Sequence, residues 1–191
     1  IEIVGSDNKA SKAENLEKSN QTNYTKISNI GIFKDYKLVD YLNESESVGL
    51  NAIKNLSKEF LIKTKCKDDY IVASITDSNS NIKIDNDLNV TISINGRGYI
   101  NEVNCNIDLE KDKNIKDIET KTEKELKKMI NETITKLQKN KTDVIGIGNL
   151  LYRTKNKLWE ENKDNWHDLV FPNLNFEINV DLNLKTKGVS D

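Results

Sequence analysis

The chain has 191 residues, with 29 Lys and Arg against 31 Asp and Glu, which gives a formal net charge of −2. A balance this even gives no overall attraction to nucleic acid or to an anionic bilayer, and we expect no nucleic-acid partner. A chain of this length is expected to form a single core. Hydrophobic residues make up only 36% of it and charged residues 31%, so we expect part of the chain to be poorly packed.

The first stretch of the chain, residues 1–26, shows almost no apolar periodicity. It predicts a flexible linker or upstream segment, and the folded domain is expected over residues 27–191. The sequence starts without Met, without a signal peptide and without an apolar run of about 18 residues. These features favour a soluble fragment excised from a longer protein.

Two short β-like runs follow, at residues 30–33 and 37–42, and the three residues between them predict a tight hairpin. A helix is expected directly afterwards, because Asn43 can cap it and Glu46 completes a capping box. Gly49 falls inside this helix, where glycine costs stability relative to Ala. We therefore expect Gly49 to permit the close approach of another backbone.

The middle of the chain alternates apolar and polar residues in three segments, at about residues 60–64, 71–75 and 88–94. Alternation of this kind predicts half-buried strands in a meander. The polar runs 77–81 and 84–87 are interpreted as turns. The run Gly96-Arg97-Gly98 suggests a bulge or bend in the strand that continues after it.

The two cysteines, Cys66 and Cys105, both lie in strand-like segments. They could form at most one bridge, and we favour two buried free thiols because cysteine is among the residue types most often buried. Neither has the CxxC or Cys/His spacing of a metal site, and the single histidine, His167, is far away in the sequence. No metal site is therefore predicted.

Helical periodicity dominates the later part of the chain, first over residues 115–140 and then over 142–161. Glutamates interrupt the lysine-rich exterior of the first helix, which is interpreted as a solvated face. The last alternating run, residues 174–184, predicts a long antiparallel strand with one dry face. Together these elements predict an α+β fold: a single domain in which an antiparallel sheet of about five strands packs on long helices, preceded by a flexible segment.

Residues that could carry out chemistry are few. A lone histidine at a helix end, such as His167, is usually an ordinary surface residue. Gly146 and Gly148 look like half of a dinucleotide loop, but the third glycine and the preceding strand are missing. We predict that the two glycines serve helix packing or a helix kink and bind no phosphate. No catalytic residue and no cofactor is predicted.

Three large aromatic residues, Trp159, Trp166 and Phe171, lie just before the last predicted strand. Such side chains bury about 150–250 Å² each, so we expect them to anchor the last helical region against the sheet. The alternative is an exposed cluster that docks a partner subunit. With Gly146 and Gly148, these aromatic residues are the interaction or structural candidates of the chain.

Two stretches of the sequence carry a family resemblance. The first is Gly31-Ile32-Phe33-Lys34 with Lys37-Leu38-Val39, followed by Leu42, Glu46 and Gly49. The second and more specific is Asp143-Val144-Ile145-Gly146-Ile147-Gly148, followed by Trp159, Trp166, Phe171 and the alternating strand. In order and spacing they resemble the C-terminal domain of the Ger(x)C lipoprotein family, the C subunit of nutrient germinant receptors in endospore-forming bacteria. The resemblance covers about residues 28–188, although Asn149 stands where an acidic residue is usual and Lys155-Asn156-Lys157 lacks a common proline.

The resemblance implies a non-enzymatic receptor subunit that is required for triggering spore germination. It also implies an N-terminal lipid that holds the protein on the outer face of the spore inner membrane, and integral-membrane A and B subunits as partners. A module that binds the small-molecule germinant itself is the alternative. A cell-wall hydrolase is disfavoured, because no paired carboxylates and no Cys/His constellation stand out.

Overall fold

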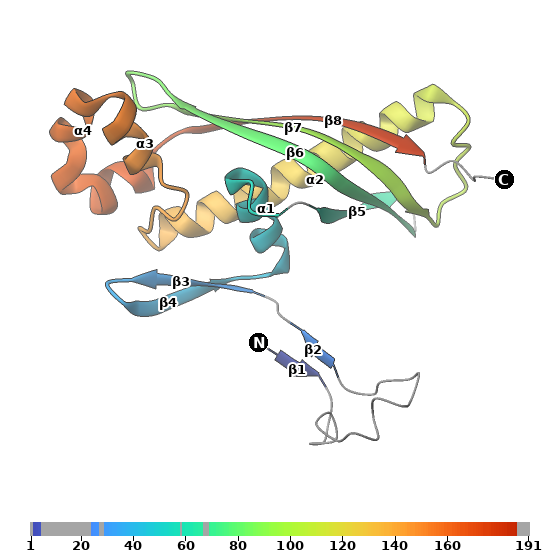
Figure 1. Ribbon diagram of the computed structural model, residues 1–191, viewed down its shortest axis with the longest axis horizontal. Coiled ribbons are helices and arrows are strands. Elements are labelled where there is room, and N and C mark those ends of the chain that lie inside the picture. Colours follow the sequence, from blue (N-terminus) through green and yellow to red (C-terminus); the bar gives the residue numbers. More distant parts are fainter. Residues whose placement is uncertain (1, 5–23, 27–28, 58, 67–68, 187–191) are drawn as a thin grey trace.

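The fold is built around a four-stranded sheet with one long helix across it. The computed structural model describes residues 2–4, 24–26, 29–57, 59–66 and 69–186. The sheet consists of β5 (Phe60–Cys66), β6 (Asp69–Ile84), β7 (Val90–Val103) and β8 (Phe176–Thr186), in that order. α2 (Asp112–Lys139) crosses one face of the sheet (Figure 1). The arrangement confirms the α+β class expected from the sequence.

β8 runs parallel to β7, which corrects the antiparallel direction expected for it. Val90 pairs with Phe176 and Ile100 with Thr186 in one parallel register, whereas β5 with β6 and β6 with β7 are antiparallel. Side chains alternate in both kinds of strand, so the sequence pattern could not reveal the direction. The direction follows from the long helical connection between β7 and β8, which returns the chain to the same end of the sheet. The described sheet has four strands rather than the expected five, and β8 lies at its edge beside β7.

β6 is longer than the sequence predicted. Residues 77–81, interpreted as a turn, lie inside this strand and pair with β7. The paired strand supplies the backbone hydrogen bonds, and polar side chains are well solvated on the open face of the sheet. A register shift leaves Thr76 as an extra residue opposite Arg97 and Gly98, which is where the Gly-Arg-Gly run suggested an irregularity. The other run interpreted as a turn, residues 84–87, does lie at the turn between β6 and β7, where the Asp85 carboxylate accepts the Asn89 amide at 2.8 Å.

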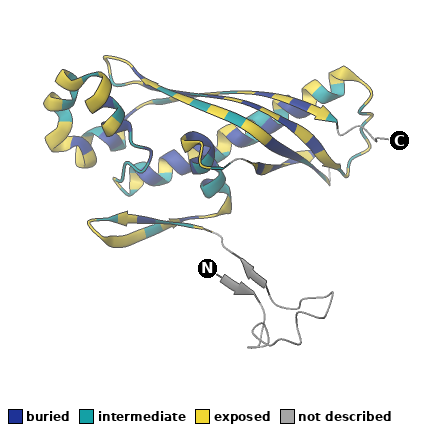
Figure 2. Cartoon of the chain, in the orientation of Figure 1, coloured by how far each residue is buried: buried dark blue, intermediate teal, exposed yellow. Residues whose placement is uncertain are grey.

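The core lies between the sheet and α2. Buried and exposed residues alternate along the strands, as the colours of Figure 2 show. α2 contributes a stripe of buried apolar side chains: Ile118, Leu126, Ile130, Ile134 and Leu137. This stripe was predicted from the helical period, which places residues three and four apart on one face.

α1 (Glu44–Lys54) packs against α2 through Gly49. Asn43 accepts the Glu46 amide at 2.9 Å, and the Glu46 carboxylate accepts the Asn43 amide at 2.7 Å, which confirms the predicted capping box. A Cβ atom on Gly49 would lie 2.7 Å from the backbone oxygen of Met129. The close backbone approach expected of Gly49 is therefore confirmed. The Thr133 hydroxyl fixes the contact by donating to the Glu46 carbonyl at 2.8 Å.

β3 (Ile30–Lys34) and β4 (Lys37–Leu42) form the predicted hairpin. β1 (Glu2–Val4) and β2 (Tyr24–Lys26) pair antiparallel with each other. Most of the linker predicted over residues 1–26 lies outside the described residues, so the boundary at residue 26 stays a prediction.

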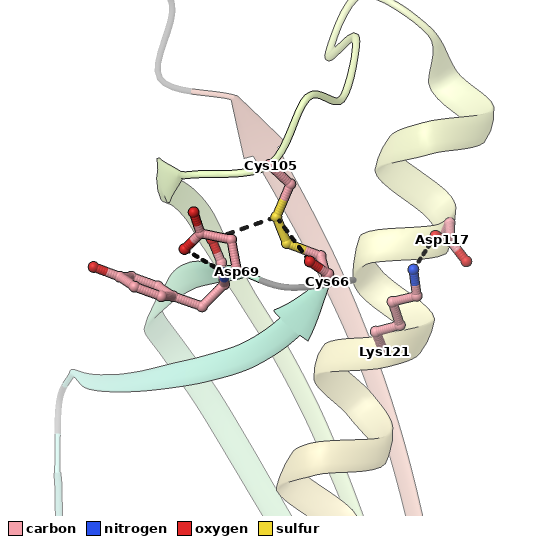
Figure 3. The surroundings of a disulfide bond; sticks show 6 residues. Cys66, Asp69, Cys105, Asp117 and Lys121 are labelled. Carbon is pink, nitrogen blue, oxygen red and sulfur yellow. Dashed lines mark hydrogen bonds and ion pairs between the residues drawn. A yellow bond between two sulfur atoms is a disulfide. The ribbon is translucent and has the colours of Figure 1, made fainter.

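Cys66 and Cys105 form a disulfide (Figure 3), so the expectation of two free thiols is wrong. β5 ends at Cys66, where the chain turns into β6, and the Asn104 amide donates to the Tyr70 carbonyl at 3.1 Å just beyond β7. These pairings bring the two Cα atoms to 6.4 Å, within the range of a disulfide. The sequence shows that each cysteine is in a strand-like segment, but it does not show which segments become neighbours.

The outer edge of β8 is partly covered by α2. The Leu182 amide donates to Glu123 at 3.0 Å, and the Leu184 amide donates to Glu119 at 2.9 Å. Lys116 lies 3.0 Å from the buried Glu119 carboxylate. Two backbone donors of the edge strand are thereby satisfied inside the chain, which leaves them unable to pair with another strand.

The predicted second helix is divided into several pieces. α3 (Ile147–Thr154) and α4 (Asn156–Asn162) are separated at Lys155, and η2 (Lys163–Asn165), η3 (Trp166–Val170) and η4 (Phe171–Asn173) lead into β8. None of the helices in the described ranges has both the length and the apolarity to cross a bilayer.

Candidate functional site

The Asp143 carboxylate organises the start of α3. Its Oδ1 atom accepts the amides of Gly146 and Ile147 at 2.8 and 3.0 Å, and its Oδ2 atom accepts the Gly148 amide at 2.7 Å. The first amides of a helix have no partner within the helix, so an acceptor there stabilises its start. Oδ2 also accepts the indole N–H of Trp166 at 3.1 Å. One carboxylate thus joins the helix start to an aromatic side chain 23 residues later.

Gly146 and Gly148 have different roles in this junction. Gly146 precedes α3 in a left-handed conformation, with φ of 92°, and a Cβ atom there would meet nothing within 4 Å. Gly148 lies in the first turn, where a Cβ atom would come within 2.7 Å of the Trp166 ring and 2.9 Å of the Trp159 ring. The two glycines therefore flank the helix start rather than kink the interior of a helix.

The three aromatic candidates lie between α3 and β8. Trp166 is 2% exposed and Phe171 is fully buried, whereas Trp159 is half-buried. The rings of Trp159 and Trp166 meet edge to face, with centroids 5.4 Å apart. The Gln138 amide donates to the carbonyls of Phe171 and Leu174 at 3.1 and 2.9 Å. The aromatic group is therefore tied to the end of α2 as well as to the start of α3.

These residues form what we call the Asp143–Trp166 junction: Asp143, Gly146, Gly148, Trp159 and Trp166. The junction fixes the start of α3 against the two tryptophans. Both Asp143 oxygens and the amides around them are already engaged, so a phosphate at this helix start would have to displace a carboxylate. The sequence motif contained Asp143, but sequence reasoning missed its capping role. The signal available was an Asp three residues before the glycine that precedes a helix.

Groups outside the junction are arranged as an ordinary polar surface. His167 is exposed, and Lys141 lies 3.2 Å from the neighbouring Asp168, whose pKa the Lys141 hydrogen bond holds below its ordinary value. Within the ranges that the structure describes, no three Asp, Glu, His or Cys side chains lie close enough to hold a metal ion.

The open face of the sheet carries two adjoining polar hollows. They have volumes of about 270 and 250 Å³ and share Asp77, Arg97 and Asn183 in their linings. The Thr76 bulge lies at the same place, and bulges change the local twist of a sheet. Amide, carboxylate and guanidinium groups line both hollows, so these hollows offer hydrogen-bond donors and acceptors to a small polar solute.

Comparison with known proteins gives a consistent set of relatives. Residues 28–188 match the family model described as spore germination B3/GerAC like, C-terminal. Spore germination protein KC of Bacillus subtilis (strain 168) is 27% identical over 198 residues, which covers 98% of this chain and 47% of that protein. The crystal structure of the GerBC protein superimposes with a TM-score of 0.73 and 22% identity, over 83% of this chain and 51% of that one. The chain thus spans about half the length of these relatives, and the likeness to GerBC shows the fold.

Proposed function

Because the chain belongs to the spore germination B3/GerAC-like C-terminal family, we propose that it acts in the C subunit of a nutrient germinant receptor. The subunit is required for triggering spore germination and works by assembling with the integral-membrane A and B subunits. The observation that carries the proposal is the family match over residues 28–188, which includes every element from β3 to β8 and the Asp143–Trp166 junction.

The subunit is placed outside the cytoplasm. A lipid at the N-terminus of the parent protein holds it on the outer face of the spore inner membrane, and residues 1–26 act as a linker or upstream segment before the domain at 27–191. The Cys66–Cys105 disulfide supports this placement, because disulfides persist in oxidising locations and are rare in the bacterial cytosol.

The role is non-enzymatic. Catalysis needs a nucleophile, acid or base that is free to reach a substrate. The carboxylate at the centre of the candidate site, Asp143, instead accepts hydrogen bonds on both oxygens, from backbone amides and from the Trp166 indole. Such an arrangement supports a rigid body for assembly.

A germination assay tests the proposal. The gene for the parent protein is deleted in a strain whose other nutrient receptors have been removed, and the loss of spore refractility after nutrient addition is followed. The deletion should abolish the response, and the wild-type gene should restore it. A Tyr152→Ala variant, which changes an exposed side chain of α3 outside the junction, should restore the response equally well. Spores that respond normally without the gene would contradict the proposal.

Direct binding of the germinant is a second candidate function, favoured by the hollows around Arg97. Arg97 stands between Asp77 and Asn183 on neighbouring strands, so cationic and anionic groups of a small solute could both find partners. A thermal-shift screen with amino acids, sugars and nucleosides tests it. A ligand at a hundred times its Kd should add about 2.7 kcal/mol of stability. Arg97→Gln should abolish the shift, and the absence of any shift would exclude a germinant site in the isolated domain.

A further inference from the structure

The β3–β4 hairpin exposes an unusual amount of apolar surface. Ten large hydrophobic side chains are exposed among the described residues, and five of them belong to this hairpin: Phe33, Tyr36, Leu38, Val39 and Tyr41. Single exposed apolar side chains are common on protein surfaces, but a concentration of them marks a site of interaction. Figure 2 shows the hairpin largely exposed below the body of the domain.

Phe33, Leu38 and Tyr41 share one face of the hairpin. Ile32 and Leu42 are buried and face the body of the domain. On the opposite face, a Cβ atom on Gly31 would touch Phe33 and Leu38 at 3.0 and 3.1 Å, so these two side chains lie together over the glycine. Tyr41 pairs directly with Gly31 across the strands. We define the hairpin face as Phe33, Tyr36, Leu38 and Tyr41, with Tyr36 at its turn.

Tyr36 has a strained backbone conformation that no contact with the described part of the chain offsets. Asp35 and Tyr36 both have positive φ, at 49° and 63°, as in the two-residue hairpin turns that favour Asn and Gly. A bulky residue is a rare occupant of the left-handed region. Tyr36 is also fully exposed, at 103% of its reference area, so its side chain gains no packing energy from the residues that the structure describes. Strain of this kind points to a contact outside the molecule.

The residues around Tyr36 favour a lipid surface as the occupant. Lys34 and Lys37 flank the turn, and a tyrosine beside lysines is typical of segments that lie at the membrane interface. Asp35 offsets one of the two positive charges, so the contact depends first on the aromatic side chains. A partner strand is less well suited to β4, because the Asp40 carboxylate already accepts the Tyr41 amide at 2.8 Å.

We propose that the hairpin face rests in the headgroup region of a phospholipid bilayer, with Tyr36 and Phe33 inserted at the interface. The inference rests on the proposed placement of the subunit at a membrane, and it adds a second contact that requires no lipid anchor. Contact through the hairpin would set the orientation of the domain on the bilayer, because β3 and β4 project from one side of the domain, below α1 and the sheet in Figure 1.

Vesicle sedimentation with the purified chain tests the inference. The wild type should bind vesicles of phosphatidylglycerol and phosphatidylcholine, and Phe33→Ser with Tyr36→Gly should lower the partition coefficient about tenfold or more. Lys34→Gln and Lys37→Gln should each lower it about fivefold at low salt. Tyr152→Ala removes an equally aromatic, 53% exposed side chain from α3 and should leave binding unchanged.

Urea unfolding and sedimentation velocity distinguish a loss of membrane binding from a loss of folding and from dimerisation. Tyr36→Gly should unfold at the same or a higher urea concentration than the wild type, so that lost binding is not lost folding. The proposal is overturned if the wild type does not sediment with the vesicles, or if the hairpin variants bind as well as it does. It is also overturned if sedimentation velocity shows a dimer that Tyr36→Gly dissolves, because the face would then join two copies. The vesicle assay contains no receptor subunit and no germinant, so its failure would leave the proposed receptor function standing.

Discussion

Replacing Gly148 by Ala should break the contact between α3 and the two tryptophans. The added Cβ atom would lie 2.7 Å from Nε1 of Trp166 and 2.9 Å from the Trp159 ring, so the Trp166 ring must move away from Asp143. Overpacking of this kind costs about 1–3 kcal/mol. Alanine recovers at most about 1 kcal/mol through its higher helix propensity. We expect a net loss of about 1–2 kcal/mol in the free energy of unfolding, measured by urea denaturation.

A double-mutant cycle separates this clash from a general effect of alanine. In a Trp166→Phe background the smaller ring removes the contact with Trp166 and leaves the contact with Trp159, so the cost of Gly148→Ala should fall without vanishing. Gly146→Ala is the matched control, because its cost comes from the left-handed backbone and should be the same in both backgrounds. If Gly148→Ala costs as much in the Trp166→Phe background as it does in the wild type, the steric explanation of Gly148 is wrong.

Three further outcomes follow from other parts of the chain. Cys66→Ser with Cys105→Ser should lower the free energy of unfolding by about 4 kcal/mol, because the disulfide closes a loop of 39 residues. A reductant should lower the urea midpoint of the wild type and leave that of the double variant unchanged. Glu119→Ala leaves a backbone donor of β8 without its acceptor, so it should cost about 1–3 kcal/mol and speed amide exchange at Leu184, and unchanged exchange would refute the edge-covering role. The Asn140 side-chain hydrogen bond holds the pKa of Asp40 below its ordinary value, so Asn140→Ala should raise that pKa in an NMR titration. The stability that this hydrogen bond adds is present above the pKa of Asp40 in the unfolded state. It is lost as pH falls through the lower pKa of Asp40 in the folded state.

Local features of the fold were predictable because short-range physics determines them. The capping box at Asn43 and Glu46, the turn of the β3–β4 hairpin and the buried stripe of α2 each depend on residues a few positions apart. The parallel direction of β8 and the Cys66–Cys105 bridge were not predictable, because both depend on which distant segments become neighbours. Residues 77–81 were misread for the same reason: a polar run becomes a strand only when a long partner such as β7 lies beside it.

In the candidate site, too, the local pattern was predictable and the long-range contacts were not. The sequence singled out Gly146, Gly148 and Trp166, but it could not show that one carboxylate connects them. Hydrogen bonds between residues 143 and 166 depend on the path of α3 and α4 between them. The hairpin face could not be predicted from the sequence for a different reason. Alternation of apolar and polar residues predicts one buried face of a hairpin, but it does not show whether the other face is covered.

Co-purification from spore membranes tests the central claim most directly. The full-length parent protein carries an affinity tag, and the detergent-solubilised inner-membrane fraction is purified on that tag. We predict that the integral-membrane A and B subunits are retained with the tagged protein, and that a tagged Tyr152→Ala variant retains them to the same extent. If the tagged protein is present in the membrane fraction at its normal level and neither subunit is retained with it, the assignment to a germinant-receptor assembly is contradicted.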